Sequence, residues 1–178
     1  MTTTRDVPPI KDEVHPITRE SVPEDRHSFH PVVGEELEFV KNLWYDDEAS
    51  RALGMEILDV SVEDGLGQAH LRMTVGPLMV NGHDICHGGY IFTFCDTAFA
   101  MACNAKGSST VAAGCDINYI APARKGDVLI AYAVERVVYG RNGLADVTVT
   151  RQDDGALIAE FRGRARDITR RTPKPSAG

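Results

Sequence analysis

Asp96 is the residue whose setting most strongly suggests chemistry. It is the only charged side chain between Gly88 and Ala105, and its neighbours include Phe94 and Phe99. Burying a carboxylate without partners costs several kcal/mol, so an Asp at this position needs either a function or a structural partner. A functional Asp96 would act as a nucleophile or a general base, with a pKa set by its apolar surroundings. The alternative is a structural Asp that caps a neighbouring backbone.

His87-Gly88-Gly89 is a second candidate, because it lies where a loop meets this apolar run. If the run is a helix, its first turn offers unpaired backbone N–H groups and the positive end of the helix dipole. Two glycines let a ligand approach that backbone closely. Such a helix end could hold the oxyanion that forms when a thioester carbonyl is attacked. A tight turn with a surface histidine explains the same three residues equally well.

The spacing of these two candidates has a consequence for assembly. Gly88 and Asp96 are eight residues apart, which is about 12 Å along a helix. A nucleophile and its oxyanion donors must both lie roughly 3 Å from one reacting centre. If both functions are real, the site combines Gly88 of one subunit with Asp96 of another. The sequence therefore predicts an obligate homodimer or a multiple of it.

Other residues are candidates for contact with a substrate. Asn81, six positions before His87, could orient a water or the substrate carbonyl, although an Asn-Gly turn is as well supported. For the anionic end of a ligand such as coenzyme A, later turns provide Arg124, Lys125 and Arg141. Cys95 is assigned to the core, because adjacent helix residues point in different directions and apolar surroundings raise the pKa of a thiol.

The elements that position these residues follow from hydrophobic periodicity. A helix from Glu35 and a helical turn from Glu48 to Leu53 precede two alternating strands. The apolar run Tyr90 to Cys103 is too long for a strand and is predicted to be a helix buried on most sides. The predicted strands are Met55 to Val62, Gln68 to Val75, Val111 to Ile120, Asp127 to Val138, Leu144 to Arg151 and Ala156 to Ile168, the last with Arg162, Arg164 and Arg166 on one face.

A single apolar helix cannot lie in solvent, so the sheet is expected to curl around it. The predicted class is α+β, with a hotdog fold in which an antiparallel sheet wraps one long central helix. The 178 residues are expected to form one folded domain, residues 35–168. Residues 1–34 and 169–178 are polar and contain prolines, which predicts a flexible N-terminal arm and C-terminal tail.

Composition argues against several classes of partner. A net charge of −7 disfavours a nucleic acid, since phosphate binding depends on an excess of Lys and Arg. The longest apolar run contains Asp96 and several small residues, so no membrane span is expected. Four cysteines without paired spacing, and no signal peptide, predict reduced thiols in a cytoplasmic protein. No metal site or cofactor is expected.

Two stretches of the chain resemble the phenylacetate-degradation thioesterases of the PaaI type. They are Asn81-Gly-His-Asp-Ile-Cys-His-Gly-Gly and Phe94-Cys-Asp-Thr-Ala-Phe-Ala-Met-Ala-Cys-Asn104, and the similarity runs from about Glu36 to Ile168. The resemblance implies a hotdog fold, a dimer-of-dimers tetramer, and hydrolysis of an aryl-acetyl-CoA or hydroxyphenylacetyl-CoA thioester.

The resemblance also implies roles for individual residues. Asp96 matches the catalytic acidic residue, Gly88 the oxyanion N–H donor, His87 a residue that positions the thioester, and Asn81 a polar residue near the carbonyl or the water. Two features depart from the family pattern: the long N-terminal arm, and Ala121 where a basic residue often precedes the proline. The second departure affects the expected CoA phosphate contacts and not the chemistry.

Two other functions fit parts of the sequence less well. A hotdog dehydratase acting on acyl thioesters would pair a carboxylate with a histidine at a different spacing, and no such second pair is found. A non-catalytic acyl-CoA-binding module that controls transcription would need a basic DNA-binding element, whereas residues 1–50 contain 12 acidic residues. The sequence therefore favours an acyl-CoA thioesterase with Asp96 as general base or nucleophile.

Overall fold

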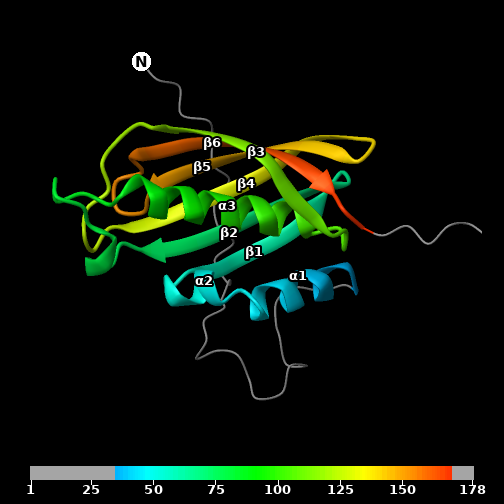
Figure 1. Cartoon of the computed structure of the whole chain (residues 1–178), viewed down its shortest axis with the longest axis horizontal. Helices are drawn as coiled ribbons and strands as arrows, with labels where there is room; N and C mark the ends of the chain where they lie inside the picture. The colour runs from blue at the N-terminus through cyan, green and yellow to red at the C-terminus, as the bar shows by residue number, and fades with distance from the viewer. Residues whose placement is uncertain (1–34, 170–178) are drawn as a thin grey trace, which may run out of the picture.

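The computed structural model describes residues 35–169 (Figure 1). Its helices are α1 (Glu35–Tyr45), α2 (Glu48–Ala52) and α3 (Gly88–Asn104), with a short 3-10 helix, η2 (Pro77–Met79). Its strands are β1 (Glu56–Glu63), β2 (Leu66–Thr74), β3 (Thr110–Tyr119), β4 (Val128–Tyr139), β5 (Asn142–Arg151) and β6 (Leu157–Asp167). The predicted N-terminal arm and all but the first residue of the predicted C-terminal tail lie outside the described residues.

The six strands form one antiparallel sheet in the order β1-β2-β4-β5-β6-β3. Asp64 and Gly65 join β1 to β2 and both have positive φ, 51° and 76°. Asp-Gly favours a two-residue turn of this kind, because its left-handed backbone matches the twist of the flanking strands. β3 follows α3 in the chain yet pairs with β6 at the edge of the sheet, so a long-range contact determines its place.

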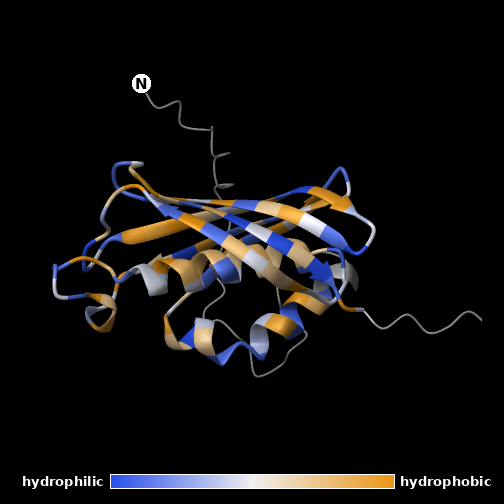
Figure 2. Ribbon diagram, turned by 45° about the horizontal axis from the view of Figure 1, so that its top comes forward, coloured by the Kyte–Doolittle hydropathy of each residue, from blue (hydrophilic) through white to orange (hydrophobic). Residues whose placement is uncertain are grey.

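The concave face of the sheet packs against α3, which contacts all six strands. Figure 2 shows the sheet arched over α3, with α1 and α2 on the other side of the helix. Phe94, Ala98 and Phe99 of α3 are at most 1% exposed. This is the predicted α+β hotdog fold, and the sheet curls because it must cover the apolar helix on most sides.

Two glycines let the strands approach α3 closely. A Cβ atom at Gly163 of β6 would lie 2.4 Å from the ring of Phe99, and one at Gly67 of β2 would lie 1.9 Å from the Ala102 carbonyl oxygen. At both points α3 therefore packs directly against the backbone of a strand. The other face of β6 carries Arg162, Arg164 and Arg166, all exposed, as the period of two predicts.

The predicted order and type of the elements are confirmed, with two differences. α3 begins at Gly88 and not at Tyr90, because the His87 side chain accepts a hydrogen bond from the Gly89 N–H and caps the helix two residues before the apolar run. The 3-10 helix η2 was not predicted. It begins at Pro77, whose fixed φ suits a first helical position. Within residues 35–169, no helix has the length and apolar character needed to cross a membrane.

The contact at Gly67 gives a stability prediction. Replacing Gly67 with Ala should lower the free energy of unfolding by about 2–3 kcal/mol, because the obstacle is backbone and cannot rotate away. Urea unfolding measures the change. The matched control is Gly76→Ala, whose added Cβ would meet nothing closer than Met79 Cε at 3.9 Å and should change stability by less than about 0.5 kcal/mol. Equal stability of the two variants would contradict the packing described.

Candidate active site

The first turn of α3 presents one free backbone donor. The His87 N–H donates to the Met79 carbonyl (2.8 Å), the Gly89 N–H to His87 Nδ1 (3.3 Å), and the Tyr90 N–H to the His87 carbonyl (2.9 Å). In the described part of the chain, the Gly88 N–H between them has no acceptor. A free N–H at a helix N-terminus is suited to bind an oxyanion.

His87 has a defined tautomer in this arrangement. Its Nδ1 accepts a hydrogen bond from a backbone N–H, so in the neutral form of the ring the proton is on Nε2. The side chain is exposed, so Nε2–H is available as a donor to a ligand. Gly89 is not a second free donor, because the imidazole occupies its N–H.

The loop before α3 is held by main-chain hydrogen bonds. The Asn81 N–H donates to the Ile85 carbonyl (2.9 Å), and the Cys86 N–H donates to the Ala123 carbonyl (2.7 Å). The Asn81 side-chain oxygen accepts from the His83 N–H (2.9 Å). The Asn-Gly turn considered from the sequence is therefore present.

A pocket of about 400 Å³ opens beside this first turn. Its lining comes from the loop, from the start of α3, from the end of β3 and from the segment that follows this strand. It comprises Asn81, Ile85, Cys86, Gly88, Ile91, Tyr119, Ile120, Ala121, Pro122 and Ala123. The structure thus brings Asn81 and Gly88 together at one pocket. Most of the lining is apolar, as expected for a site that binds an organic acyl group.

Asp96 lies two turns further along α3 and is not part of this lining. Its carboxylate is partly buried, and burial raises its pKa above the ordinary value of 3.8. Within residues 35–169 it makes no hydrogen bond or ion pair, so no structural partner accounts for it. A carboxyl group with a raised pKa and no partner is typical of functional sites.

Two residues near these groups were not predicted from the sequence. Tyr119 of β3 donates its hydroxyl proton to the Gly88 carbonyl (2.8 Å). Cys115 of β3 is close enough to Asp96 that, after burial, the carboxylate raises the pKa of its thiol. A period of two puts Cys115 and Tyr119 on one face of a strand, but only the pairing of β3 with β6 brings that face to α3.

The basic candidates are divided between the two ends of the sheet. Arg124 and Lys125 are exposed in the turn beside the pocket, where Arg124 Nη1 donates to the Asp84 carbonyl (3.4 Å). Arg141 lies beyond the other end of β4, a strand of 12 residues that spans roughly 40 Å. Arg124 and Arg141 of one chain therefore cannot contact the same phosphate.

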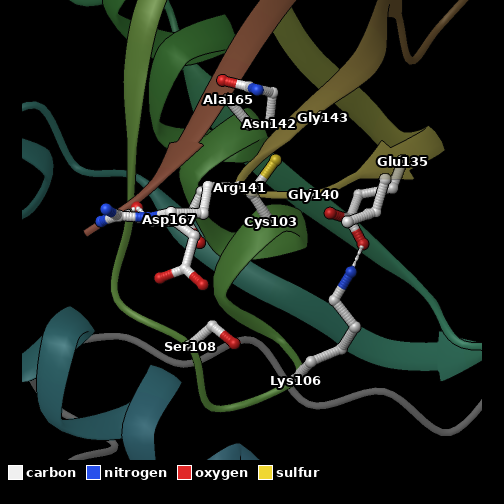
Figure 3. A pocket seen from close by; sticks show the side chains of 12 residues that line it. Cys103, Lys106, Ser108, Glu135, Gly140, Arg141, Asn142, Gly143, Ala165 and Asp167 are labelled. Carbon is white, nitrogen blue, oxygen red and sulfur yellow. Dashed lines mark hydrogen bonds and ion pairs between the residues drawn. The ribbon is translucent and has the colours of Figure 1, made fainter. Parts of the chain in front are cut away.

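Arg141 lines a separate pocket of about 60 Å³ near the C-terminal end of α3. There its Nη2 donates to the Asp167 carbonyl at 2.7 Å. Figure 3 shows Lys106 reaching the Glu135 carboxylate on the opposite side of this pocket. Glu135 is 3% exposed and also accepts a hydrogen bond from the Gly67 N–H (2.8 Å), so the ion pair serves packing.

Cys95 is fully buried, and burial raises the pKa of its thiol far above the ordinary range. Its assignment to the core is confirmed, because an inaccessible protonated thiol cannot attack a substrate. Among residues 35–169, no three His, Cys, Asp or Glu side chains gather in a way that could hold a metal ion.

Known proteins resemble this chain in both sequence and structure. Residues 83–158 match a family described as "Thioesterase superfamily". The acyl-coenzyme A thioesterase PaaI of Escherichia coli (strain K12) is 38% identical over 126 residues, which cover 71% of this chain and 86% of that protein. The structure of the E. coli PaaI protein from the phenylacetic acid degradation operon superposes with a TM-score of 0.70 at 34% identity, covering 75% of this chain and 94% of that chain.

A second relative has a ligand in its structure. This protein of Streptococcus mutans UA159, bound to acetyl CoA, superposes with a TM-score of 0.57 at 27% identity. The match covers 64% of this chain and 90% of that chain. Together these similarities confirm the resemblance found in the sequence.

The raised pKa of Asp96 predicts that wild type and Asp96→Asn differ in stability by an amount that depends on pH. The native state binds this proton more tightly than the unfolded state, so Asp96 costs stability once the pH rises above its ordinary pKa of 3.8. Asp96→Asn should therefore be more stable than wild type at pH 7, and this advantage should shrink towards zero at pH 3. Urea unfolding at several pH values measures it.

Asp154 provides a control, because its pKa is shifted in the direction opposite to that of Asp96. Its hydrogen bond from Arg151 lowers the pKa of the carboxyl group, so ionisation of Asp154 stabilises the native state at neutral pH. Asp154→Asn should be less stable than wild type at pH 7 and equal to it at low pH. If both variants shifted in the same direction, the electrostatic account of Asp96 would be wrong.

Proposed function

Because the chain belongs to the thioesterase superfamily, as an acyl-CoA thioesterase of the PaaI type, we propose that it cleaves an aryl-acetyl-CoA or hydroxyphenylacetyl-CoA thioester to the free acid and coenzyme A. The observation that carries the proposal is the Gly88 N–H, which has no acceptor among the described residues and lies at a largely apolar pocket of about 400 Å³. The E. coli relative's name, an acyl-coenzyme A thioesterase, supports the reaction.

The first turn of α3 binds the thioester carbonyl in this proposal. The carbonyl oxygen accepts a hydrogen bond from the Gly88 N–H at the positive end of the helix dipole. His87 positions the thioester by donating a hydrogen bond from its Nε2–H. The side chain of Asn81, in the loop before α3, contacts the carbonyl or the water. When negative charge develops on the oxygen, these fixed donors stabilise it without reorganising, which lowers the barrier.

Asp96 supplies the second half of the chemistry by one of two routes. As a general base it takes a proton from water, and the resulting hydroxide attacks the carbonyl carbon. As a nucleophile it attacks that carbon itself and forms an anhydride, which water then hydrolyses. In both routes the C–S bond breaks and the CoA thiolate leaves and takes up a proton. Its partly buried and unpartnered carboxylate suits either role.

The site requires two copies of the chain, because eight residues of helix separate Gly88 from Asp96. The edge of β3 suits the contact. Among the described residues β3 pairs only with β6, and Val111, Tyr119 and Ile120 of this segment are 45%, 51% and 55% exposed. An exposed apolar edge strand is a template for pairing with a second chain. We propose a homodimer through β3, or a dimer of two such dimers.

We expect the coenzyme A phosphates to meet basic side chains near the pocket. The exposure of Arg124 and Lys125 in the turn beside the pocket supports this expectation. Arg141 would contact CoA only if assembly brought a partner's β4–β5 turn to the pocket. The four cysteines are free thiols, which supports a reducing compartment such as the cytoplasm.

Removal of the Asp96 charge tests the chemical role. Asp96→Asn should lower kcat at least 100-fold, because a general base or nucleophile contributes about that much or more. Release of free thiol from a panel of aryl-acetyl, benzoyl and medium-chain acyl-CoAs measures it. Asp153→Asn, in the exposed turn between β5 and β6, should keep wild-type turnover. Near wild-type activity of Asp96→Asn would end the proposed mechanism.

Mixing two inactive variants tests whether the site is shared between chains. Gly88→Val blocks the oxyanion donor and Asp96→Asn blocks the base, so each variant alone should be inactive. In a dimer of one chain of each kind, one of the two shared sites has neither substitution. After unfolding and refolding as an equal mixture, the sample should recover roughly a quarter of wild-type activity. If it recovers none while forming mixed dimers, both groups act within one chain.

A further inference from the structure

Tyr119 makes a contact with the site that the proposed chemistry does not use. It is the last residue of β3, the strand that follows α3 in the chain. Its hydroxyl donates to the Gly88 carbonyl at 2.8 Å. A Cβ atom at Gly88 would lie 2.9 Å from the Tyr119 ring, so the ring packs directly against this residue.

The Tyr119 hydroxyl is one end of a continuous hydrogen-bond chain. The Gly88 carbonyl and the Gly89 N–H belong to the same peptide group. That N–H donates to His87 Nδ1 at 3.3 Å. A hydrogen bond to a carbonyl polarises its peptide group and strengthens donation by the N–H. Tyr119 therefore acts, through one peptide, on the nitrogen that determines the tautomer of His87.

We propose that Tyr119 is a positioning residue of this site. Its hydroxyl orients the Gly88–Gly89 peptide, keeps the His87 proton on Nε2, and holds the free Gly88 N–H towards the pocket. Its ring covers Gly88 and forms one wall of the pocket. Partial burial raises the pKa of the phenol, so the hydroxyl keeps its proton at neutral pH and remains a donor. The catalytic part of this inference rests on the proposed thioesterase function.

Two variants separate this role from a structural one. Tyr119→Phe keeps the ring and removes only the hydroxyl. Tyr139→Phe removes a hydroxyl from a similarly exposed tyrosine (53% against 51%) at the end of β4 away from the pocket. Both variants should stay folded and unfold cooperatively in urea, and the midpoint of Tyr119→Phe should fall by no more than the loss of one hydrogen bond explains.

The first measurement is the tautomer of the His87 ring, read from the NMR chemical shifts of its two nitrogens. A His87→Gln variant assigns these signals to His87. Wild type and Tyr139→Phe should show the tautomer with the proton on Nε2. Tyr119→Phe should show a mixture of both tautomers, because the Gly89 N–H becomes a weaker donor. An unchanged ring in Tyr119→Phe would overturn the proposal. This readout does not require turnover, so it stands even if the proposed function fails.

The second measurement is kinetic. Loss of one hydrogen bond that aligns the transition-state donors should lower kcat of Tyr119→Phe about fivefold to tenfold and change KM by less than about twofold. Tyr139→Phe should match wild type in both constants. A Tyr119→Phe enzyme with wild-type kcat would overturn the positioning role. Absence of hydrolysis in the wild type itself would count against the proposed function and not against the hydrogen-bond chain.

Discussion

The need to keep α3 out of water is the constraint on which the rest of this structure depends. Six strands curl around the helix, and glycines at positions 67 and 163 bring backbone against it where a larger residue would not fit. The same burial positions both halves of the candidate site. It places the first turn of α3 beside the segment after β3, and it puts Asp96 in surroundings that disfavour its charge.

Asp96 illustrates the usual conflict between stability and function. An ionised carboxylate that is partly buried and lacks a partner within residues 35–169 costs the fold stability at neutral pH. Elsewhere the chain pairs its less exposed acids, as with Glu135 and Lys106, or Asp146 and Arg162. The contrast between these paired acids, which maintain the fold, and the unpaired Asp96 supports the chemical role that we propose for Asp96.

Much of the fold was predictable, because helix α3 and all six strands have clear periodicity in the sequence. That Gly88 and Asp96 of one chain are too far apart to act on the same reacting centre followed from the rise of a helix alone. The position of Tyr119 could not be predicted, because β3 reaches the first turn of α3 only through its pairing with β6. The separation of Arg124 from Arg141, by contrast, follows from the length of β4 between them, and local periodicity predicted that strand.

The loop from Asn81 to His87 owes its shape to main-chain hydrogen bonds, with the side chains of Ile85 and of Ile91 in the next turn facing the pocket. Substitutions at those two positions leave the bonds to the Met79 and Ala123 carbonyls in place. Substitutions there can therefore reshape the pocket wall while the first turn of α3 keeps its geometry. Such an arrangement lets descendants of one ancestral scaffold diverge in the acyl groups they accept without rebuilding the machinery that cleaves them.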